Sequence, residues 1–188
     1  MKRLGLALLI GLLAVMPAWA ADVTIDAAVD AGAYKSLRAT ACTTVLICYH
    51  VGIDVGTDLV YWKTSDGGAT WAAAVVVFTG NVIASDIWFD QWTPGNVGTL
   101  ILMWWIEDVT HTVRFRTLDT NGDALGTERT VFTGASAAAG YATHVTGAKA
   151  RGGNLLVAFA IDAGVESGTY RSTDAGVTWG VRTNLYEA

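Results

Sequence analysis

A spacing of 54 residues recurs along most of this chain. The segment Val-Phe-Thr-Gly occurs at residues 77–80 and again at residues 131–134, and 131 − 77 = 54. An eight-residue segment at 64–71 returns in similar form at 172–179, twice that distance along the chain. A fixed period in this range indicates a repeat fold, in which each repeat is one supersecondary unit covered by its neighbours. The chain is therefore constrained to a row of similar modules, near residues 23–76, 77–130 and 131–184.

Each module contains one long apolar run, and the three runs align on the period without a gap. They occupy residues 45–54, 99–108 and 153–162, and turn residues bound them. Runs of this kind are typical of strands buried on both faces. A shorter strand is predicted before each run, at Tyr34–Ala41, Ile87–Trp92 and Tyr141–Ala150. Two strands are predicted after each run: Leu59–Lys63 and Ala72–Phe78, then Thr112–Thr117 and Glu128–Phe132, then Thr169–Ser172 and Val181–Tyr186.

Four antiparallel strands per repeat predict an all-β, propeller-type fold of about three four-stranded blades. No amphipathic helix is predicted after residue 20. Known propellers have about four to eight blades, so three do not close a ring. Two chains could join as a six-bladed ring with cyclic symmetry, or the chain could be part of a larger propeller. The expectation is a homo-oligomer, most simply a dimer, with the larger propeller as the alternative.

The first 20 residues predict a secretory signal peptide. Lys2 and Arg3 precede an apolar run from Leu4 to Met16, and the small-residue sequence Ala18-Trp19-Ala20 suits cleavage. The alternative is an uncleaved anchor helix. Residues 21–188 would then form one exported domain, secreted or periplasmic, with no predicted membrane span. The net charge of −5 and the absence of a basic stripe argue against a nucleic-acid partner.

Cys42 and Cys48 flank a turn between two predicted strands. A two-residue turn at Thr43-Thr44 would place the sulfur atoms on opposite faces, whereas a five-residue loop would place them opposite each other. Two buried free thiols are expected, with a disulfide as the alternative that an exported protein permits.

The most specific motif lies in the turn between the third and fourth strands of two modules. It follows the pattern Ser/Thr-x-Asp-x-Gly-x-Thr-Trp. In such a turn the Asp carboxylate and the Ser or Thr hydroxyl accept backbone N–H groups, and Gly adopts a positive φ. The Trp offers an apolar plate that can lock the hairpin. The motif residues are Thr64, Asp66, Gly68 and Trp71, and Ser172, Asp174, Gly176 and Trp179. The middle module keeps a turn at 119–123 but has Leu125 in place of the Trp.

These two segments, TSDGGATW and STDAGVTW, resemble the Asp-box (BNR-repeat) family of propellers. That family includes sialidases, some glucan-degrading hydrolases and non-enzymatic propellers such as sortilin-type receptors. The resemblance implies that the Asp-box residues are structural and peripheral, so no catalytic residue is assigned. A sialidase-like enzyme would also have an arginine triad, a Tyr nucleophile paired with Glu, and an acid/base Asp. The nearest match to its first arginine stretch is Tyr34–Arg38, which lacks the family's order and its Pro.

Three residues are candidates for ligand binding: Arg38, Trp88 and Trp92. All three are predicted on innermost strands, near a central channel, and exposed indole faces suit sugar rings. The alternatives are a solvated Arg and blade-to-blade packing of the Trp rings. Packing is the expected role of Trp104 and Trp105.

No cofactor and no metal site are expected. The carboxylates Asp54, Asp108 and Asp162 fall on the period and could form a ring, but turn construction is the better explanation. Residues 119–123 resemble the start of a calcium loop that lacks its later Gly and Glu, so a polar turn is expected. His50, His111 and His144 lie in separate modules without ligand spacing.

The sequence therefore predicts a non-enzymatic binding module that recognises carbohydrate or a cell-surface protein. The alternative is a sialidase-like glycoside hydrolase, an exo-α-sialidase, or a fragment of one.

Overall fold

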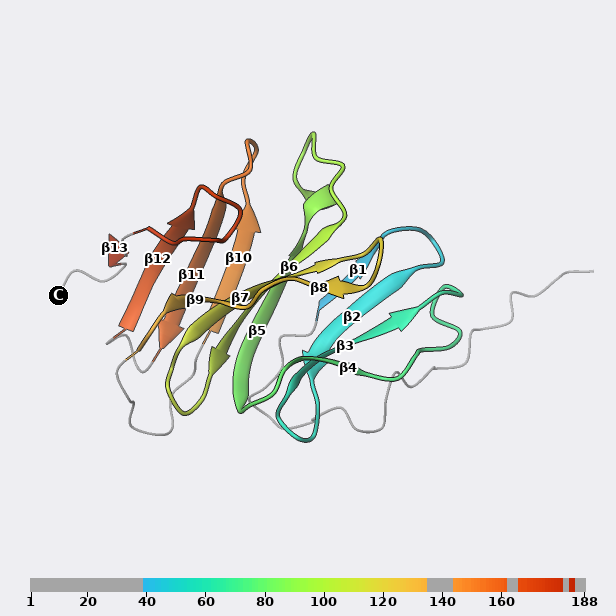
Figure 1. The fold of residues 1–188 in the computed structure, drawn as a ribbon, viewed down its shortest axis with the longest axis horizontal. Helices are drawn as coiled ribbons and strands as arrows, with labels where there is room; N and C mark the ends of the chain where they lie inside the picture. Colours follow the sequence, from blue (N-terminus) through green and yellow to red (C-terminus); the bar gives the residue numbers. More distant parts are fainter. Residues whose placement is uncertain (1–38, 135–143, 162–165, 181–182, 185–188) are drawn as a thin grey trace, which may run out of the picture.

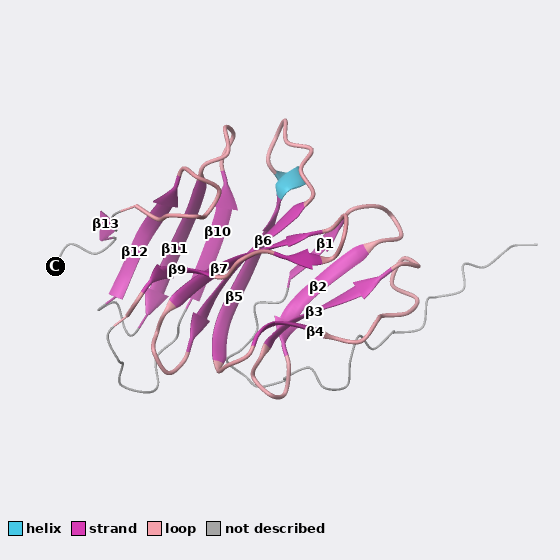
Figure 2. Ribbon diagram, in the orientation of Figure 1, coloured by secondary structure: helices cyan, strands magenta, loops and turns pink. Residues whose placement is uncertain are grey.

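Three antiparallel β-sheets follow one another along the chain, and their strands account for nearly all regular structure (Figure 1). The computed structural model describes residues 39–134, 144–161, 166–180 and 183–184. Within these ranges the only helix is one 3₁₀ turn, η1 (Asp90–Trp92), seen in Figure 2. Among the described residues, no helix is long and apolar enough to cross a membrane. The prediction of an all-β fold is confirmed for this part of the chain.

Each sheet is built from consecutive strands in chain order. The first sheet contains β1 (Ala39–Cys42), β2 (Cys48–Ile53), β3 (Leu59–Thr64) and β4 (Val75–Phe78). The second contains β5 (Val82–Phe89), β6 (Leu100–Glu107), β7 (Val113–Asp119), β8 (Ala124–Leu125) and β9 (Arg129–Phe132), with β8 and β9 both paired to β7. The third contains β10 (His144–Lys149), β11 (Leu155–Ile161), β12 (Glu166–Ser172) and β13 (Thr183–Asn184).

The observed strands lie close to the predicted ones, with the main differences at their ends. The second strand of each sheet falls inside its predicted apolar run. The short strand β8 was not predicted. The strand predicted at Ile87–Trp92 is wrong at both ends, because β5 begins at Val82, stops at Phe89 and is followed by η1. Residues 34–38 of the first predicted strand lie outside the described residues.

The 54-residue period aligns β2 with β6 without a gap, but aligned residues of the two strands do not point to the same face of their sheets. In the first sheet Val51 pairs with Tyr61, whereas in the second sheet Trp104 pairs with Phe115, the counterpart of Tyr61. Five residues separate the paired Ile53 and Leu59, but six separate Ile106 and Val113. A one-residue change in register moves every side chain of a strand to the other face. Tyr49, Val51 and Ile53 therefore take the roles that Leu102, Trp104 and Ile106 have in the second sheet.

Apolar side chains fill two seams between neighbouring sheets. The first seam joins Tyr49, Val51, Ile53, Leu59, Tyr61 and Val77 of the first sheet to Ile87, Phe89, Ile101, Met103 and Trp105 of the second. The second seam joins Ala84, Leu102, Trp104, Ile106, Val113, Phe115 and Val131 of the second sheet to Val145, Leu155, Val157 and Phe159 of the third. Burial of this apolar surface is the main stabilising contribution to the fold.

The outer strands of the first two sheets contact the next sheet at a position set by the period. Phe78 of β4 lies with its ring centre 5.3 Å from that of Trp105. One period later, Phe132 of β9 stacks 5.0 Å from Phe159. The contact between an outer strand and the next sheet is thus the same at both seams. It is kept although β2 and β6 are turned over relative to each other when aligned on the period.

The two cysteines form a disulfide, so the expectation of free thiols is wrong. Cys42 and Cys48 are directly paired between β1 and β2, with Cα atoms 4.0 Å apart. The connection is the five-residue loop 43–47, in which Thr43 donates its N–H to the carbonyl of Ile47 at 2.9 Å. This loop length puts both sulfur atoms on one face of the sheet.

Candidate functional site

The turn at residues 64–71 of the first sheet is held together by its own polar groups. The Asp66 carboxylate accepts the backbone N–H of Thr70 at 2.9 Å and the Thr70 hydroxyl at 2.6 Å. The Thr64 hydroxyl donates to Asp66 at 2.7 Å and accepts the N–H of Gly68 at 2.9 Å. Gly68 has a φ of +92°, which favours glycine. The carboxylate is thus occupied by the turn itself.

The turn at residues 172–179 of the third sheet repeats these bonds. Asp174 accepts the N–H and hydroxyl of Thr178 at 2.8 and 2.5 Å, and the Ser172 hydroxyl accepts the N–H of Gly176 at 2.8 Å. The two Trp residues differ in their contacts. Trp71 lies edge-on to His50 within the first sheet, whereas Trp179 lies edge-on to Phe115 of the second sheet. The third-sheet turn therefore also anchors one sheet to another.

Stability at low pH should depend on these two carboxylates. Hydrogen bonds from the Thr70 hydroxyl, the Thr70 N–H and the Thr64 hydroxyl lower the pKa of Asp66 from 3.8 to about 2. The equivalent bonds from Thr178 and Ser172 lower the pKa of Asp174 to about 2. A lowered folded-state pKa stabilises the fold above the unfolded value near 3.8, and this contribution is lost as the pH falls through about 2.

Replacing both residues, as Asp66→Asn with Asp174→Asn, should therefore destabilise the protein at neutral pH but not at the acid end. We expect the difference in urea midpoint between the native protein and this variant to be constant above about pH 5 and to vanish toward pH 2. A difference that does not change with pH would contradict the role of these ionised carboxylates.

The strongest candidate for ligand contact is an indole pair beside the β5–β6 connection. Trp88 is half-buried on β5, and Trp92 ends η1 with 43% of its surface exposed. Their ring centres lie 5.8 Å apart at 82°, and Phe89 meets Trp92 edge-on at 6.3 Å. Trp92 therefore stands at nearly a right angle to two rings that support it, while part of its own surface faces solvent.

Polar contacts to the third sheet hold this connection in place. The Trp88 indole N–H donates to the Thr93 hydroxyl at 2.9 Å, and that hydroxyl donates to the Lys149 carbonyl at 2.9 Å. Asp90 is only 3% exposed, and its carboxylate forms an ion pair with the Lys149 ammonium at 2.7 Å. In Figure 1 the connection rises above β5 and β6, beside the turn from β10 to β11. Trp92 is thus presented from a loop tied to two sheets.

The sequence identified part of this arrangement. Trp88 and Trp92 are brought together, although Trp92 lies in η1 and not on the predicted strand. Arg38 lies outside the described residues. The polar anchors Asp90, Thr93 and Lys149 were missed. A signal was present in the length of the connection, residues 90–99, because the corresponding connections span only 43–47 and 150–154.

The remaining candidate carboxylates serve turns and seams. Asp54 accepts the N–H of Asp58 at 3.0 Å, and Asp108 accepts the side-chain amide of Asn81 at 3.1 Å. Asp162 lies outside the described residues. Asp123 accepts the Tyr49 hydroxyl across the first seam at 2.6 Å. Within the described ranges, no group of three or more His, Cys, Asp or Glu side chains is placed to hold a metal ion.

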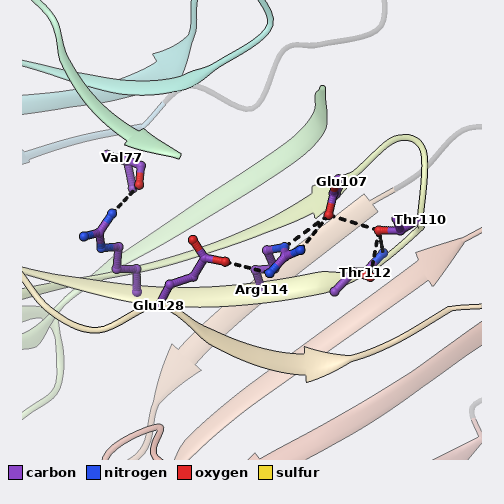
Figure 3. Close-up of polar contacts among 7 residues, drawn as sticks. Val77, Glu107, Thr110, Thr112, Arg114 and Glu128 are labelled. Carbon is purple, nitrogen blue, oxygen red and sulfur yellow. Dashed lines mark hydrogen bonds and ion pairs between the residues drawn. The ribbon is translucent and has the colours of Figure 1, made fainter. Parts of the chain in front are cut away.

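Two arginines of β7 are committed to contacts within the chain. Arg114 forms ion pairs with Glu107 at 2.9 Å and Glu128 at 2.6 Å, and Thr110 donates a further hydrogen bond to Glu107 (Figure 3). The guanidinium also lies over the Phe78 ring, 5.2 Å from its centre. Arg116 donates to the carbonyls of Val77 and Gly126 at 2.5 and 2.7 Å. These groups hold the outer strands together and do not converge on a shared open space.

No protein-family model matches the chain, and no curated protein matches it in sequence. The site must therefore be interpreted from its own geometry.

Proposed function

We propose that this chain is a non-enzymatic binding module of Asp-box propeller type that recognises carbohydrate, with Trp92 as the principal contact. The observation that carries the proposal is the half-exposed indole of Trp92, held edge-on by Trp88 and Phe89. Such a residue costs little conformational entropy on binding because its supporting loop is already ordered.

The chemistry of the loop suits a sugar. An indole offers a flat apolar face and a polar N–H, which together match a ring with apolar C–H faces and hydroxyl edges. Gln91, next to Trp92, is exposed and carries an amide that can donate and accept hydrogen bonds. The anchors that would otherwise compete for a ligand, Asp90 and Thr93, are buried and already bonded to Lys149.

Replacing Trp92 by Ala should remove binding with little effect on the fold. Loss of one central aromatic contact typically weakens a complex by about tenfold or more. The free energy of unfolding should fall by about 1 to 2 kcal/mol, because the indole is 43% exposed and loses its edge-on contacts with Trp88 and Phe89. A glycan array would identify the ligand, and calorimetry with that glycan would compare the native protein with the variant.

Val97→Ala is the matched control, because Val97 is an exposed apolar residue of the same connection. It should bind as the native protein does. Equal binding by Trp92→Ala and the native protein would contradict the proposal. Binding to a cell-surface protein but to no glycan would contradict carbohydrate as the ligand and favour a protein ligand. Turnover of a fluorogenic sialoside would overturn the proposal in favour of a hydrolase.

We further propose that the three sheets are propeller blades and that a second copy completes the ring. The repeated contact of an outer strand with the next sheet, seen for β4 and β9, supports this. Leu102 is 2% exposed in the second seam, whereas Leu156, one period later, is 47% exposed on the third sheet. A neighbouring sheet supplied by another chain would cover Leu156.

Light scattering of the purified protein should then give twice the chain mass. Leu156→Lys should reduce that mass to one chain, whereas Leu46→Lys, at an equally exposed Leu in the β1–β2 loop, should not. A stable monomer of the native protein would contradict ring closure by a second copy, and a higher mass would favour a larger assembly.

The disulfide between Cys42 and Cys48 supports export to a secreted or periplasmic location, because disulfides persist in oxidising compartments. The native protein should begin near Ala21. A native chain that keeps residues 1–20 would contradict cleavage.

A further inference from the structure

The turn between β7 and β8 combines an Asn-Gly step at its tip with a contact to the first sheet. Asn121 is the only Asn of the chain that precedes a Gly. Asn121 and Gly122 are both exposed, and they lie between Thr120 and Asp123 in the connection 120–123. A reactive pair of residues is thus placed inside a turn that also has a structural role.

An Asn-Gly step can react with itself and with water. The Gly backbone nitrogen attacks the side-chain carbonyl carbon of Asn, the new N–C bond closes a succinimide ring, and ammonia leaves. Water then opens the ring at one of its two carbonyl–nitrogen bonds. One opening gives Asp, and the other gives isoaspartate, in which the main chain runs through the side-chain carboxyl carbon and is one atom longer. Gly favours the attack because it has no Cβ to obstruct its nitrogen.

The local structure leaves this nitrogen free and uncrowded. No described residue accepts a hydrogen bond from the Gly122 N–H. A Cβ built on Gly122 would meet no neighbouring atom. The Asn121 N–H donates to the Asp119 carboxylate at 3.0 Å, which holds the start of the turn but not the reacting groups.

The Asp66-Gly67 step of the first sheet provides a contrast. The Gly67 N–H donates to the Leu46 carbonyl at 2.9 Å, and the Asp66 carboxylate accepts two hydrogen bonds from Thr70 at 2.9 and 2.6 Å. Ring closure at Asp66 would break these bonds. The turn at 64–71 is therefore protected from the reaction to which the turn at 120–123 is open.

Conversion of Asn121 would act on the first seam, because the turn holds Tyr49. The Tyr49 hydroxyl lies 3.1 Å from the Thr120 carbonyl oxygen and 2.6 Å from the Asp123 carboxylate. That carboxylate also pairs with the Lys63 ammonium at 2.7 Å. Thr120 and Asp123 stand on either side of the Asn-Gly step. An extra main-chain atom between them changes their spacing, so both cannot keep their contact with one hydroxyl.

We propose that Asn121 is a site of spontaneous deamidation, and that its isoaspartate product releases the turn from Tyr49 and weakens the first seam. The reaction consumes one water molecule, releases one ammonia molecule and involves no change of oxidation state. It depends neither on carbohydrate binding at Trp92 nor on ring closure by a second copy.

Peptide mapping by mass spectrometry tests the reaction, after incubation of the native protein in mildly alkaline buffer at body temperature. Tryptic peptide 117–129 contains Asn121 and should gain the mass of one amide-to-acid exchange, then separate into Asp and isoaspartate forms on chromatography. Peptide 152–171 contains Asn154, which precedes Leu155, and should convert far more slowly. The incubated protein should unfold at a lower urea concentration than the fresh protein.

Gly122→Ala is the matched control, because its Cβ meets no atom and the φ of Gly122 is not positive. It should keep the urea midpoint of the fresh protein and slow the conversion about tenfold or more. Asn121→Asp supplies the product of normal chain length and should keep nearly the same midpoint. In Tyr49→Phe, which lacks the hydroxyl, incubation should lower the midpoint less than in the native protein.

Three results would each overturn the proposal. Peptide 117–129 could convert no faster than peptide 152–171, Gly122→Ala could convert as fast as the native protein, or protein rich in isoaspartate could keep its urea midpoint. Should Gly122→Ala fail to fold, Asn121→Gln replaces it, because the longer side chain must close a larger and less favourable ring.

Discussion

Replacing Trp104 by Ala should lower the free energy of unfolding by about 4 kcal/mol, the usual cost of deleting a large core aromatic. Trp104 is fully buried, and its ring centre lies 5.3 Å from that of Phe115 on β7. On its other side the ring lies against Gly147 of β10, where an added Cβ would meet it. The side chain therefore contacts both the second and the third sheet. Its loss would leave a cavity that neither sheet can close, and urea unfolding would measure the cost.

Trp104→Phe separates the loss of packing from the loss of a polar group. The Trp104 indole N–H has no hydrogen-bond partner among the described residues. Phe removes this N–H and keeps one aromatic ring, so we expect a loss of well under half that of Ala. Trp92→Ala is the surface control. A loss below about 1 kcal/mol for Trp104→Ala would show that the second seam is not the main core.

Replacing Lys149 by Met should destabilise the protein by about 3 kcal/mol, at the lower end of the range for broken buried ion pairs. The change leaves the buried Asp90 carboxylate without its cation, 2.7 Å away in the native protein. The lower end applies because the Lys149 side chain keeps 17% of its surface exposed. The carbohydrate binding that we propose at Trp92 should weaken as well, because η1 loses its ion pair with β10 and keeps only the hydrogen bond from Thr93 to the Lys149 carbonyl.

Adding Asp90→Asn to Lys149→Met should restore much of the lost stability, since the uncompensated charge is then removed. The double-mutant cycle, measured by urea unfolding, reports the coupling between the two side chains. A coupling near zero would mean that the ion pair does not hold the connection. Recovery of stability without recovery of binding would place the role of the pair in orienting Trp92.

Local sequence patterns predicted the strands well. The apolar runs at 45–54, 99–108 and 153–162 contain β2, β6 and β11. β2 and β6 are buried on both faces, and such a strand must be apolar throughout, whereas β11 exposes Leu156 on one face. Because a strand like β2 or β6 is apolar on both faces, its sequence does not show which face meets which neighbouring sheet. A gap-free alignment could not show that β2 and β6 are turned over relative to each other, since that depends on one residue in the following loop.

The candidate site was predicted only in its aromatic part. Trp88 and Trp92 stood out as residues, but their anchors Asp90 and Lys149 are 59 residues apart and belong to different sheets. No local pattern connects two such residues. The disulfide was missed for a related reason, because the length of the loop between Cys42 and Cys48 decides the pairing.

By itself the sequence determined the repeat, the number of sheets in the described chain and the two equivalent turns at 64–71 and 172–179, because each depends on residues close together in the chain. Only the tertiary structure decided which faces meet, which carboxylates are buried and where Trp92 is exposed. These features arise when sheets pack, and packing depends on loop lengths and on contacts between distant residues. The contrast between Asp123 and Val177 shows this most clearly. One period apart, Asp123 forms an ion pair with Lys63 at the first seam, whereas Val177 is apolar and 55% exposed at the turn of the third sheet.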